Sequence, residues 1–343
     1  MDTPPDQSET ALVTTVLRRL GLIAPDVEPL FMPLTGGVAS DIWKVEVGGR
    51  VFVVKRALPK LRVAADWRAP TSRNASEVGW LELAGRIAPS AVPEILAHDA
   101  QAGLFAMTYL PPDAHPVWKA QLADGETDPD FAARVGSTIA AIHDATAGDE
   151  VIARRFANDA VFHSIRLEPY LEATAARHPQ LRTRLFALSR ETLATKRALV
   201  HGDVSPKNIL AGPRGPIFLD AECAWYGDPA FDLAFCLNHL LLKCLWRPDA
   251  ARGFLACFDA LAAAYRSTAA WEPSEALEAR AARLLPALFL ARVDGKSPVE
   301  YLTEEAEKDR VRATAIPLLE KPPTVLAAVR EAWMRELGPR SLP

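Results

Sequence analysis

The chain has 343 residues, of which 49% are hydrophobic and 24% charged, the composition of an ordinary soluble globular protein with one large or two smaller domains. A formal net charge of −4 excludes the strongly basic surface of a general nucleic-acid binder and a polybasic membrane anchor. The four cysteines lack the close paired spacing of zinc sites, so we expect buried, reduced thiols.

The sequence shows no targeting or membrane segment. The most apolar stretch, residues 231–246, is too short for a membrane span and contains Asp232 and Lys243. The first ten residues are acidic and contain prolines but no apolar run, so we expect that they do not form a signal peptide. We therefore expect a cytoplasmic protein that binds neither nucleic acid nor membrane. The sequence leaves its oligomeric state open.

The first third of the chain predicts mainly strands. Residues 41–47 place Trp43, Val45 and Val47 on one face of a strand, and Gly48-Gly49 then predicts a two-residue hairpin turn. In chain order, the predicted elements are a flexible tail (1–10), a helix (11–20), strands (41–47 and 51–55), an amphipathic helix (74–87) and short strands (near 94–98 and 104–110).

Beyond Pro111-Pro112, long alanine- and leucine-rich segments have helical spacing, interrupted once by strand-like pieces around residues 198–220. This change predicts an α+β, bilobal fold, with a small antiparallel β lobe carrying one helix (11–110) and a larger, mainly α-helical lobe (111–343). Such a layout implies a ligand-binding cleft between the lobes. The predicted helices of the second lobe are 129–147, 164–177, 231–246, 250–265, 274–291 and 323–337.

The strongest motif is His201-Gly202-Asp203-Val204-Ser205-Pro206-Lys207-Asn208. Its Asp and Asn stand five residues apart, the spacing of the kinase catalytic loop, in which the Asp orients the substrate hydroxyl and the Asn holds a metal ion. Twelve residues on, the apolar run 217–219 ends in Asp220, which supplies a carboxylate for Mg²⁺. The spacing therefore predicts Asp203 as the catalytic residue and Asn208 and Asp220 as metal ligands.

With these motifs, the chain from about residue 34 to about residue 242 resembles the aminoglycoside phosphotransferase superfamily, which has a protein-kinase-like fold and includes choline, homoserine and methylthioribose kinases. His-Gly-Asp in place of His-Arg-Asp is typical of that family. Asp220-Ala221-Glu222 is similar to the Asp-x-Glu of choline and methylthioribose kinases. Glu222 would bind the metal directly or through water, or would form a supporting salt bridge.

The resemblance implies ATP and Mg²⁺ as cofactors. Lys55, at the end of a predicted strand, would contact the nucleotide phosphates, and Glu77 would pair with it. A competing interpretation is local, because Asn74-Ala75-Ser76-Glu77 is a capping-box pattern in which Glu77 serves the N-terminus of its own helix.

Further nucleotide contacts follow from position in the family. A turn at Gly36 and Gly37 would cover the phosphates with backbone N–H groups. The backbone of Met107 and Tyr109, where the family joins its lobes, would hydrogen-bond adenine. A turn with two glycines departs from the three-glycine loop of protein kinases, as the family does.

Four other polar residues have counterparts in the family. Asp232 resembles the aspartate that braces the catalytic loop. We expect His201 to brace that loop too, rather than to act as acid or base. His143 is expected to be a satisfied core residue, and Arg292 resembles a late arginine of methylthioribose kinases that would contact the acceptor.

The predicted function is transfer of the γ-phosphate of Mg·ATP to a hydroxyl of a small molecule, such as a sugar or amino alcohol. A regulatory pseudokinase would lack at least one of four residues, Lys55, Asp203, Asn208 or Asp220, all of which are present. A protein kinase would carry an activation segment ending in Ala-Pro-Glu. An aminoglycoside antibiotic kinase is a further alternative. From Pro111 onward, 31 acidic residues face 28 basic ones, which disfavours a polycationic acceptor unless Glu300, Glu304 and Glu305 form a local acidic pocket.

Overall fold

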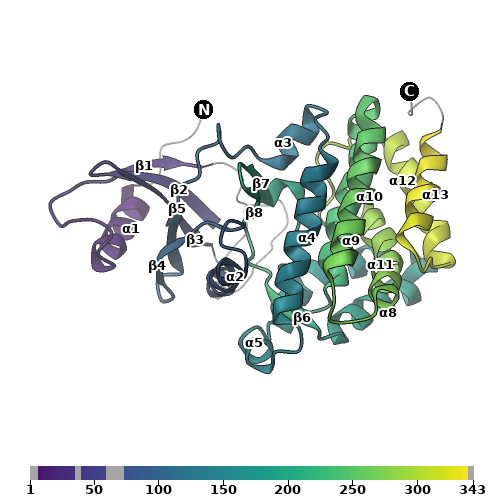
Figure 1. The fold of residues 1–343 in the computed structure, drawn as a ribbon, viewed down its shortest axis with the longest axis horizontal. Coiled ribbons are helices and arrows are strands. Elements are labelled where there is room, and N and C mark those ends of the chain that lie inside the picture. The colour runs from purple at the N-terminus through teal and green to yellow at the C-terminus, as the bar shows by residue number, and fades with distance from the viewer. Residues whose placement is uncertain (1–6, 35–39, 59–72, 339–343) are drawn as a thin grey trace. The chain divides into compact units, whose positions relative to one another are not determined.

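The computed structural model describes residues 7–34, 40–58 and 73–338 (Figure 1). Its contacts divide the chain into two compact units, Met1–Pro111 and Pro112–Pro343. The predicted phosphate-covering turn at Gly36 and Gly37 lies outside the described residues.

An antiparallel sheet of five strands forms the centre of the N-terminal unit, in the order β1-β2-β3-β5-β4. The predicted hairpin is confirmed, because Gly48 (φ 54°) and Gly49 (φ 75°) both adopt the left-handed conformation that a tight two-residue turn between twisted strands requires. The elements are α1 (Gln7–Arg19), β1 (Leu30–Pro33), β2 (Ser40–Val47), β3 (Arg50–Ala57), α2 (Arg73–Ile87), β4 (Ile95–Asp99) and β5 (Leu104–Thr108).

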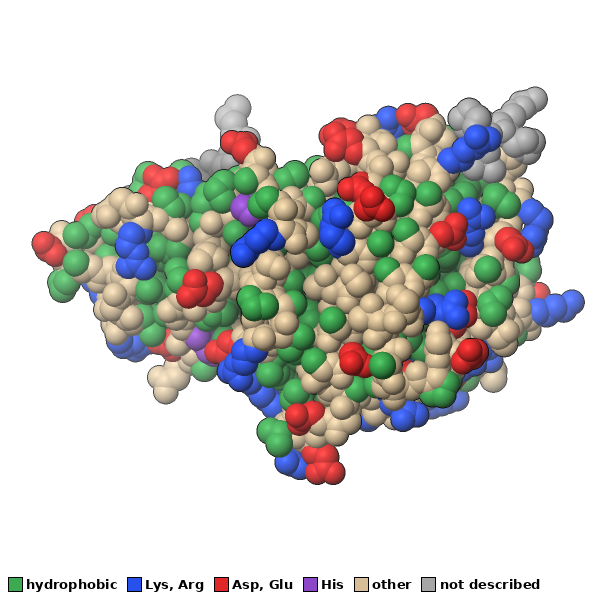
Figure 2. All heavy atoms as spheres, viewed as in Figure 1, with side chains coloured by type: hydrophobic (Ala, Val, Ile, Leu, Met, Phe, Trp, Pro, Cys, Tyr) green, Lys and Arg blue, Asp and Glu red, His purple; other side chains and the backbone are tan. Residues whose placement is uncertain are grey.

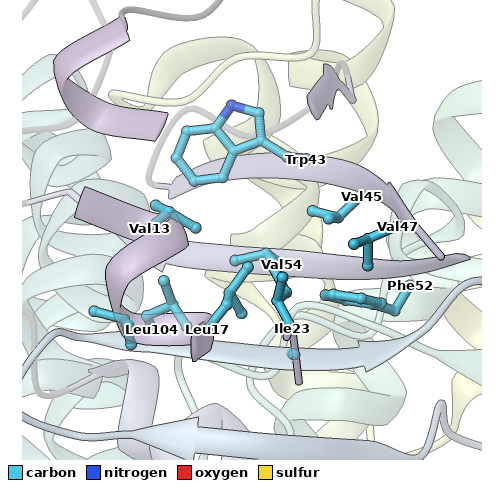
Figure 3. Close-up of a cluster of buried hydrophobic side chains, with 11 residues drawn as sticks. Val13, Leu17, Ile23, Trp43, Val45, Val47, Phe52, Val54 and Leu104 are labelled. Atoms are coloured by element: carbon cyan, nitrogen blue, oxygen red, sulfur yellow. The ribbon is translucent and has the colours of Figure 1, made fainter. Parts of the chain in front are cut away.

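Helix α1 and the sheet enclose one hydrophobic core (Figure 3). As predicted, Trp43, Val45 and Val47 lie on one face of β2, where they join Val13 and Leu17 of α1. Alternation along a strand and a 3–4-residue spacing along a helix bring these side chains to the same layer.

The predicted N-terminal tail is too long. Helix α1 begins at Gln7, so residues 7–10 are helical rather than flexible. Glu9 in its first turn pairs with Arg56 of β3 at 2.7 Å, and the Thr14 hydroxyl donates to the carbonyl of Thr10. The acidic side chain favours a helix N-terminus, and its partner lies 47 residues away, beyond the reach of local pattern.

The C-terminal unit is mainly helical, with α4, α9 and α10 side by side at its centre (Figure 1). Two small sheets, β6-β9 and β7-β8, flank the predicted catalytic loop. The strands are β6 (Ala198–Val200), β7 (Ile209–Gly212), β8 (Gly215–Phe218) and β9 (Trp225–Gly227). The longer helices are α4 (Pro129–Thr146), α8 (Arg182–Ala194), α9 (Ala230–Trp246), α10 (Ala251–Thr268), α11 (Ser274–Asp294), α12 (Glu305–Glu320) and α13 (Leu326–Leu337). The shorter helices are α3 (Trp118–Ala123), α5 (Glu150–Arg155), α6 (Asp159–Phe162) and α7 (Ala173–Arg177). Short 3₁₀ turns lie at Pro179–Leu181, Pro206–Asn208 and Pro248–Ala250.

Several segments differ from the sequence-based expectation, which lacks the short helices α3, α5 and α6. The predicted helix 164–177 is a π-helix, η1 (His163–Glu172), that continues into α7. Pro169 within it has no N–H to donate, and wide helical turns of this kind are frequent at functional sites. Helices α8 and α12 were absent from the prediction because their sequences are rich in charged residues and only weakly amphipathic.

The four cysteines are buried free thiols, as expected. On the face of the helical unit shown in Figure 2, acidic and basic side chains are interspersed. Among the residues that the structure describes, no helix has both the length and the apolar character to cross a membrane.

Candidate active site

The catalytic loop is fixed by the first turn of helix α9. The buried carboxylate of Asp232 accepts hydrogen bonds from the backbone N–H groups of His201 (2.7 Å) and Gly202 (2.8 Å). Its Oδ2 atom also lies 3.2 Å from Nε2 of His143, whose Nδ1 is 2.7 Å from the hydroxyl of Tyr265. The expected roles are confirmed, because Asp232 braces the loop and His143 is a satisfied core residue.

His201 joins the catalytic loop to the end of β8. Its Nδ1 accepts from the backbone N–H of Asp203 at 3.1 Å, so the ring proton lies on Nε2, which donates to the carbonyl of Leu219 at 3.1 Å. Burial lowers the pKa of His201, against the charges of Asp232 and Asp203. A neutral imidazole with both nitrogens engaged confirms the bracing role.

Gly202 explains why this loop reads His-Gly-Asp. Its φ of 81° lies in the left-handed region, and a Cβ there would lie 2.8 Å from both the Cβ and the carbonyl oxygen of Cys223. A side chain at this position would therefore meet both backbone strain and a steric clash.

The carboxylate of Asp203 is buried between two cations. Its Oδ2 lies 2.9 Å from Nη2 of Arg166 and 3.4 Å from Nζ of Lys207. Burial alone would raise the pKa of Asp203, but the charges of Arg166 and then Lys207 outweigh it and hold the pKa below its usual value. The group is an anion at neutral pH, as orientation of a substrate hydroxyl requires.

Arg166 is the residue of this site that no local pattern in the sequence marks. It comes from the π-helix, and its Nε also donates to the carbonyl of Gly202 at 2.5 Å. An arginine within a helix that buries Ile165 and Leu167 is the one available signal, because a buried cation needs an anionic partner. Lys207 lies within the motif itself, where its position before Asn208 does not indicate a role.

The two predicted metal ligands, Asn208 and Asp220, both follow Asp203 in the chain. The amide nitrogen of Asn208 donates to the carbonyl of Asp203 at 3.1 Å, which leaves the amide oxygen of Asn208 as the atom able to face a cation. Asp220 follows β8 with a φ of 67°, rare for a residue other than glycine and frequent at functional sites. The negative charge of Asp220 raises the pKa of Asp203, but the charges of Arg166 and Lys207 lower it more.

This donor set fits Mg²⁺ held largely by phosphates. Within the described part of the chain, no group of three or more His, Cys, Asp or Glu side chains could hold a metal by itself. Asp203, Asp220 and Glu222 therefore form no closed cage. One carboxylate and one amide oxygen suit a hard cation that takes its other ligands from phosphate and water. Glu222 is buried and partnered, and its contribution to the metal stays a prediction.

In the N-terminal unit, the predicted pair of Lys55 and Glu77 is formed. Nζ of Lys55 lies 2.7 Å from Oε2 of Glu77, and both side chains are buried. The capping-box interpretation is wrong, because α2 begins at Arg73 and Asn74 lies inside the helix rather than at its N-cap. The amide of Asn74 has no hydrogen-bond partner among the described residues.

The residues predicted to contact adenine lie at the end of β5. Met107 pairs with Val53 of β3 and Ile95 of β4, so its backbone lies between two strands. Tyr109 is the second residue of the chain beyond Met107 and lies past the end of the strand, with Nζ of Lys44 5.0 Å from its ring centroid. The backbone of Tyr109 is thus outside the strand pairing, and its role toward adenine stays a prediction.

Residues 31–271 match the model of the phosphotransferase enzyme family named APH. The chain belongs to this family. Among curated proteins, methylthioribose kinase from Bacillus cereus is 25% identical over 245 residues, which cover 64% of this chain and 62% of that protein. The match thus spans less than two thirds of that relative's length. The superfamily resemblance is confirmed.

Two solved structures show the same fold. LicA in complex with AMP superposes with a TM-score of 0.55 at 16% identity, covering 92% of this chain and 99% of that one. Amicoumacin kinase hAmiN, in complex with AMP-PNP, Ca²⁺ and Ami, superposes with a TM-score of 0.53 at 14% identity, covering 94% and 98%. The predicted α+β, bilobal, kinase-like fold is confirmed.

Proposed function

We propose that this protein is an ATP-dependent kinase that transfers the γ-phosphate to a hydroxyl group of a small molecule. The observation that carries the proposal is the state of Asp203, a buried carboxylate that two cations keep ionised on a loop fixed by Asp232 and His201. An anion held in this way can orient an acceptor hydroxyl and accept its proton as the phosphoryl group transfers.

The chain's own residues divide the remaining work. Mg²⁺, when bound, would neutralise charge on the phosphates, and Asn208 and Asp220 would hold it. Glu77 fixes the ammonium group of Lys55, which would contact the phosphates of the nucleotide. Gly36, Gly37, Met107 and Tyr109 keep their proposed contacts to phosphate and adenine. The named ligands of the two similar structures, AMP and AMP-PNP, support an adenine nucleotide.

Phosphoryl transfer of this kind needs positioning and charge stabilisation rather than a covalent enzyme intermediate. In this proposal Asp203 would face the acceptor, while Asn208 and Asp220 would face the metal. A regulatory pseudokinase is disfavoured, since Lys55, Asp203, Asn208 and Asp220 are all present and the Lys55–Glu77 pair is formed.

The test is ADP formation from Mg·ATP in the presence of a panel of hydroxyl acceptors, beside nucleotide binding by calorimetry. We expect Asp203→Asn to remove turnover with the ATP dissociation constant changed by less than about threefold, because Asp203 faces the acceptor. Near wild-type turnover in Asp203→Asn would refute the catalytic assignment. Failure of the wild-type protein to bind ATP would refute the kinase proposal itself.

A further inference from the structure

Helix α9 carries a buried stripe of side chains that starts beside the catalytic loop. Phe235, His239, Lys243 and Trp246 follow one another at spacings of three or four residues, so they lie along one face of the helix. The helix is buried along almost its entire length, and Lys243 is only 1% exposed. A lysine is almost never so deeply buried without a partner.

Lys243 has no such partner among the residues that the structure describes. Its Nζ lies 4.6 Å from the ring centroid of Trp246 and 4.8 Å from that of Tyr301, and among the described residues it makes no hydrogen bond or ion pair. His239 likewise has no hydrogen-bond partner there and contacts the ring of Phe235 at 5.3 Å.

Two more donors near this stripe are unused. The hydroxyl of Tyr301 and the Nε of Arg292 are buried without hydrogen bonds to any described residue. The other end of the Arg292 guanidinium is engaged, because Nη1 donates to the hydroxyl of Tyr170 at 3.1 Å and to Ser297. The region thus offers several N–H and O–H donors from which no described residue accepts a hydrogen bond.

The charges of this region are mostly positive. Lys119, Lys243 and Arg292 form what we call the cationic cluster, with the neutral imidazole of His239 beside it, and Glu300, whose charge acts on Lys243, is paired with Lys119. Burial lowers the pKa of Lys243 to about 7, and the charges of Lys119 and Arg292 act in the same direction. Burial also lowers the pKa of His239, with Arg292 and Lys243 adding to the effect.

The cluster adjoins the catalytic aspartate through a short series of contacts. The guanidinium of Arg166, which pairs with Asp203, lies 5.9 Å from the ring centroid of Phe235. That ring contacts Tyr170 at 5.6 Å, and Tyr170 accepts the hydrogen bond from Arg292. All of these residues belong to the C-terminal unit.

We propose that Lys243, His239 and Arg292 recognise a carboxylate or phosphate group on the acceptor. This inference rests on the proposed function, since the anionic compound must also carry the hydroxyl that Asp203 orients. An anion would receive the unused donors and neutralise the buried positive charge, whereas a cationic amino alcohol or aminoglycoside would be repelled. Glu300 and Glu305, two of the three carboxylates that could form an acidic pocket, are instead paired with Lys119 and with Arg312.

Anion binding can be measured without turnover. Inorganic phosphate and acetate would be titrated calorimetrically at pH 7 into the wild-type protein and into Lys243→Met. We expect at least one anion to bind, with an affinity at least about tenfold weaker in Lys243→Met, since a charge-assisted hydrogen bond is lost. The stronger of the two anions indicates which acidic group the acceptor carries.

The matched control is Lys196→Met. Lys196 lies 4.3 Å from the ring centroid of Trp225 and pairs with Asp159, so it shares the aromatic contact of Lys243 but touches no residue of the cationic cluster. Its substitution should leave anion binding unchanged. If neither anion binds the wild-type protein, or if Lys243→Met binds both as tightly, the inference is overturned.

A second arm uses turnover on one sugar framework in four forms, neutral, acid, phosphate and amine. We expect kcat/KM to be at least about tenfold higher for the acid or the phosphate than for the neutral sugar, with the preference lost in Lys243→Met. If a neutral or amino sugar were the best substrate, the inference of an anionic acceptor would be overturned, while the kinase proposal would stand. If no form is phosphorylated and ATP does not bind, the proposed function fails, and the anion titration alone decides the inference.

Discussion

The guanidinium of Arg166 holds both the carboxylate of Asp203 and the backbone that carries it. Its Nη2 lies 2.9 Å from Oδ2 of Asp203, while its Nε donates to the carbonyl of Gly202, the preceding residue. The carboxylate and its peptide are therefore positioned by one rigid group. Because Arg166 lies in the π-helix η1, this residue joins that helix to the catalytic loop.

Replacing Arg166 should impair catalysis more than it impairs nucleotide binding. Arg166→Met removes both contacts and leaves Lys207 as the cation that pairs with the buried carboxylate among the described residues, so we expect kcat to fall about a hundredfold with the ATP dissociation constant nearly unchanged. Arg166→Lys should recover part of the rate, because it restores the positive charge but not the planar guanidinium that contacts both Asp203 and Gly202. Steady-state kinetics with calorimetric ATP binding would check this.

The control for Arg166 is the second cation of Asp203. Lys207 is half-exposed and lies farther away, at 3.4 Å, so Lys207→Met should lower kcat by no more than about fivefold. An effect of Lys207→Met as large as that of Arg166→Met would contradict the positioning role of the arginine.

Gly202→Ala should destabilise the protein through a clash as well as through backbone strain. The new Cβ would lie 2.8 Å from the carbonyl oxygen of Cys223, and the φ of 81° disfavours any side chain. We expect a loss of about 2–4 kcal/mol in the free energy of unfolding, measured by urea denaturation.

Gly148→Ala separates the two causes in that experiment. Gly148 has a similar φ of 71° but nothing within 4 Å of its Cβ position, so its substitution should cost only about 1 kcal/mol. Equal losses at the two positions would mean that Cys223 moves aside and that the close approach is not what requires glycine.

The buried pair of Lys55 and Glu77 allows the effect of Lys55 on the stability of the fold to be measured separately from its effect on nucleotide binding. Lys55→Met removes the ammonium group that lies 2.7 Å from Oε2 of Glu77 and should cost about 3 kcal/mol of stability. The double variant Lys55→Met/Glu77→Leu replaces both charges with apolar groups and should recover most of that loss. Chemical denaturation of the two variants would measure this.

ATP affinity should not recover in the double variant if Lys55 contacts phosphate. We expect the ATP dissociation constant to rise at least about tenfold in both variants, while that for AMP, which lacks the β- and γ-phosphates, changes less. Recovery of ATP affinity together with stability would show that Lys55 acts on the nucleotide only by holding the fold.

The parts of the site that could be predicted from the sequence are those with local spacing or a family pattern. Asp203 and Asn208 stand within one loop, and Asp220 follows a recognisable apolar strand. The pairing of Lys55 and Glu77 spans 22 residues, and position in the family favours it over the helix cap that the local pattern indicates. The structure decides for the pair because α2 starts one residue before Asn74.

The parts that could not be predicted depend on tertiary contacts. Arg166 reaches Asp203 across 37 positions in the chain, from a segment whose composition indicates only an amphipathic helix. The sequence of α9 indicates an apolar core helix, and His239 and Lys243 read there as isolated polar residues. Their proposed role is visible only in the structure, where Arg292 and Tyr301 lie near them and no described residue accepts a hydrogen bond from the Nε of Arg292 or the hydroxyl of Tyr301.

The last prediction follows from the cost of burying Lys243 without an anion. Burial lowers its pKa from 10.5 to about 7, with Lys119 and Arg292 adding to the shift and Glu300 opposing it. Below pH 7 the lysine is protonated in both the folded and the unfolded chain, and folding must bury the charge at a cost of up to about 5 kcal/mol. Between about pH 7 and pH 10.5 the unfolded chain binds the extra proton, so the free energy of unfolding rises with pH, and above that range the cost is gone.

Lys243→Met should therefore be more stable than the wild-type protein at pH 7, with the difference shrinking toward pH 10. Urea denaturation at pH 7, 8.5 and 10 checks this, and Lys196→Met, whose lysine is paired and partly exposed, should show no such gain. If Lys243 served only for packing, Lys243→Met would instead lower the free energy of unfolding at every pH. A gain in stability together with a loss of anion binding in the same variant would identify Lys243 as a residue that serves a ligand at the expense of the fold.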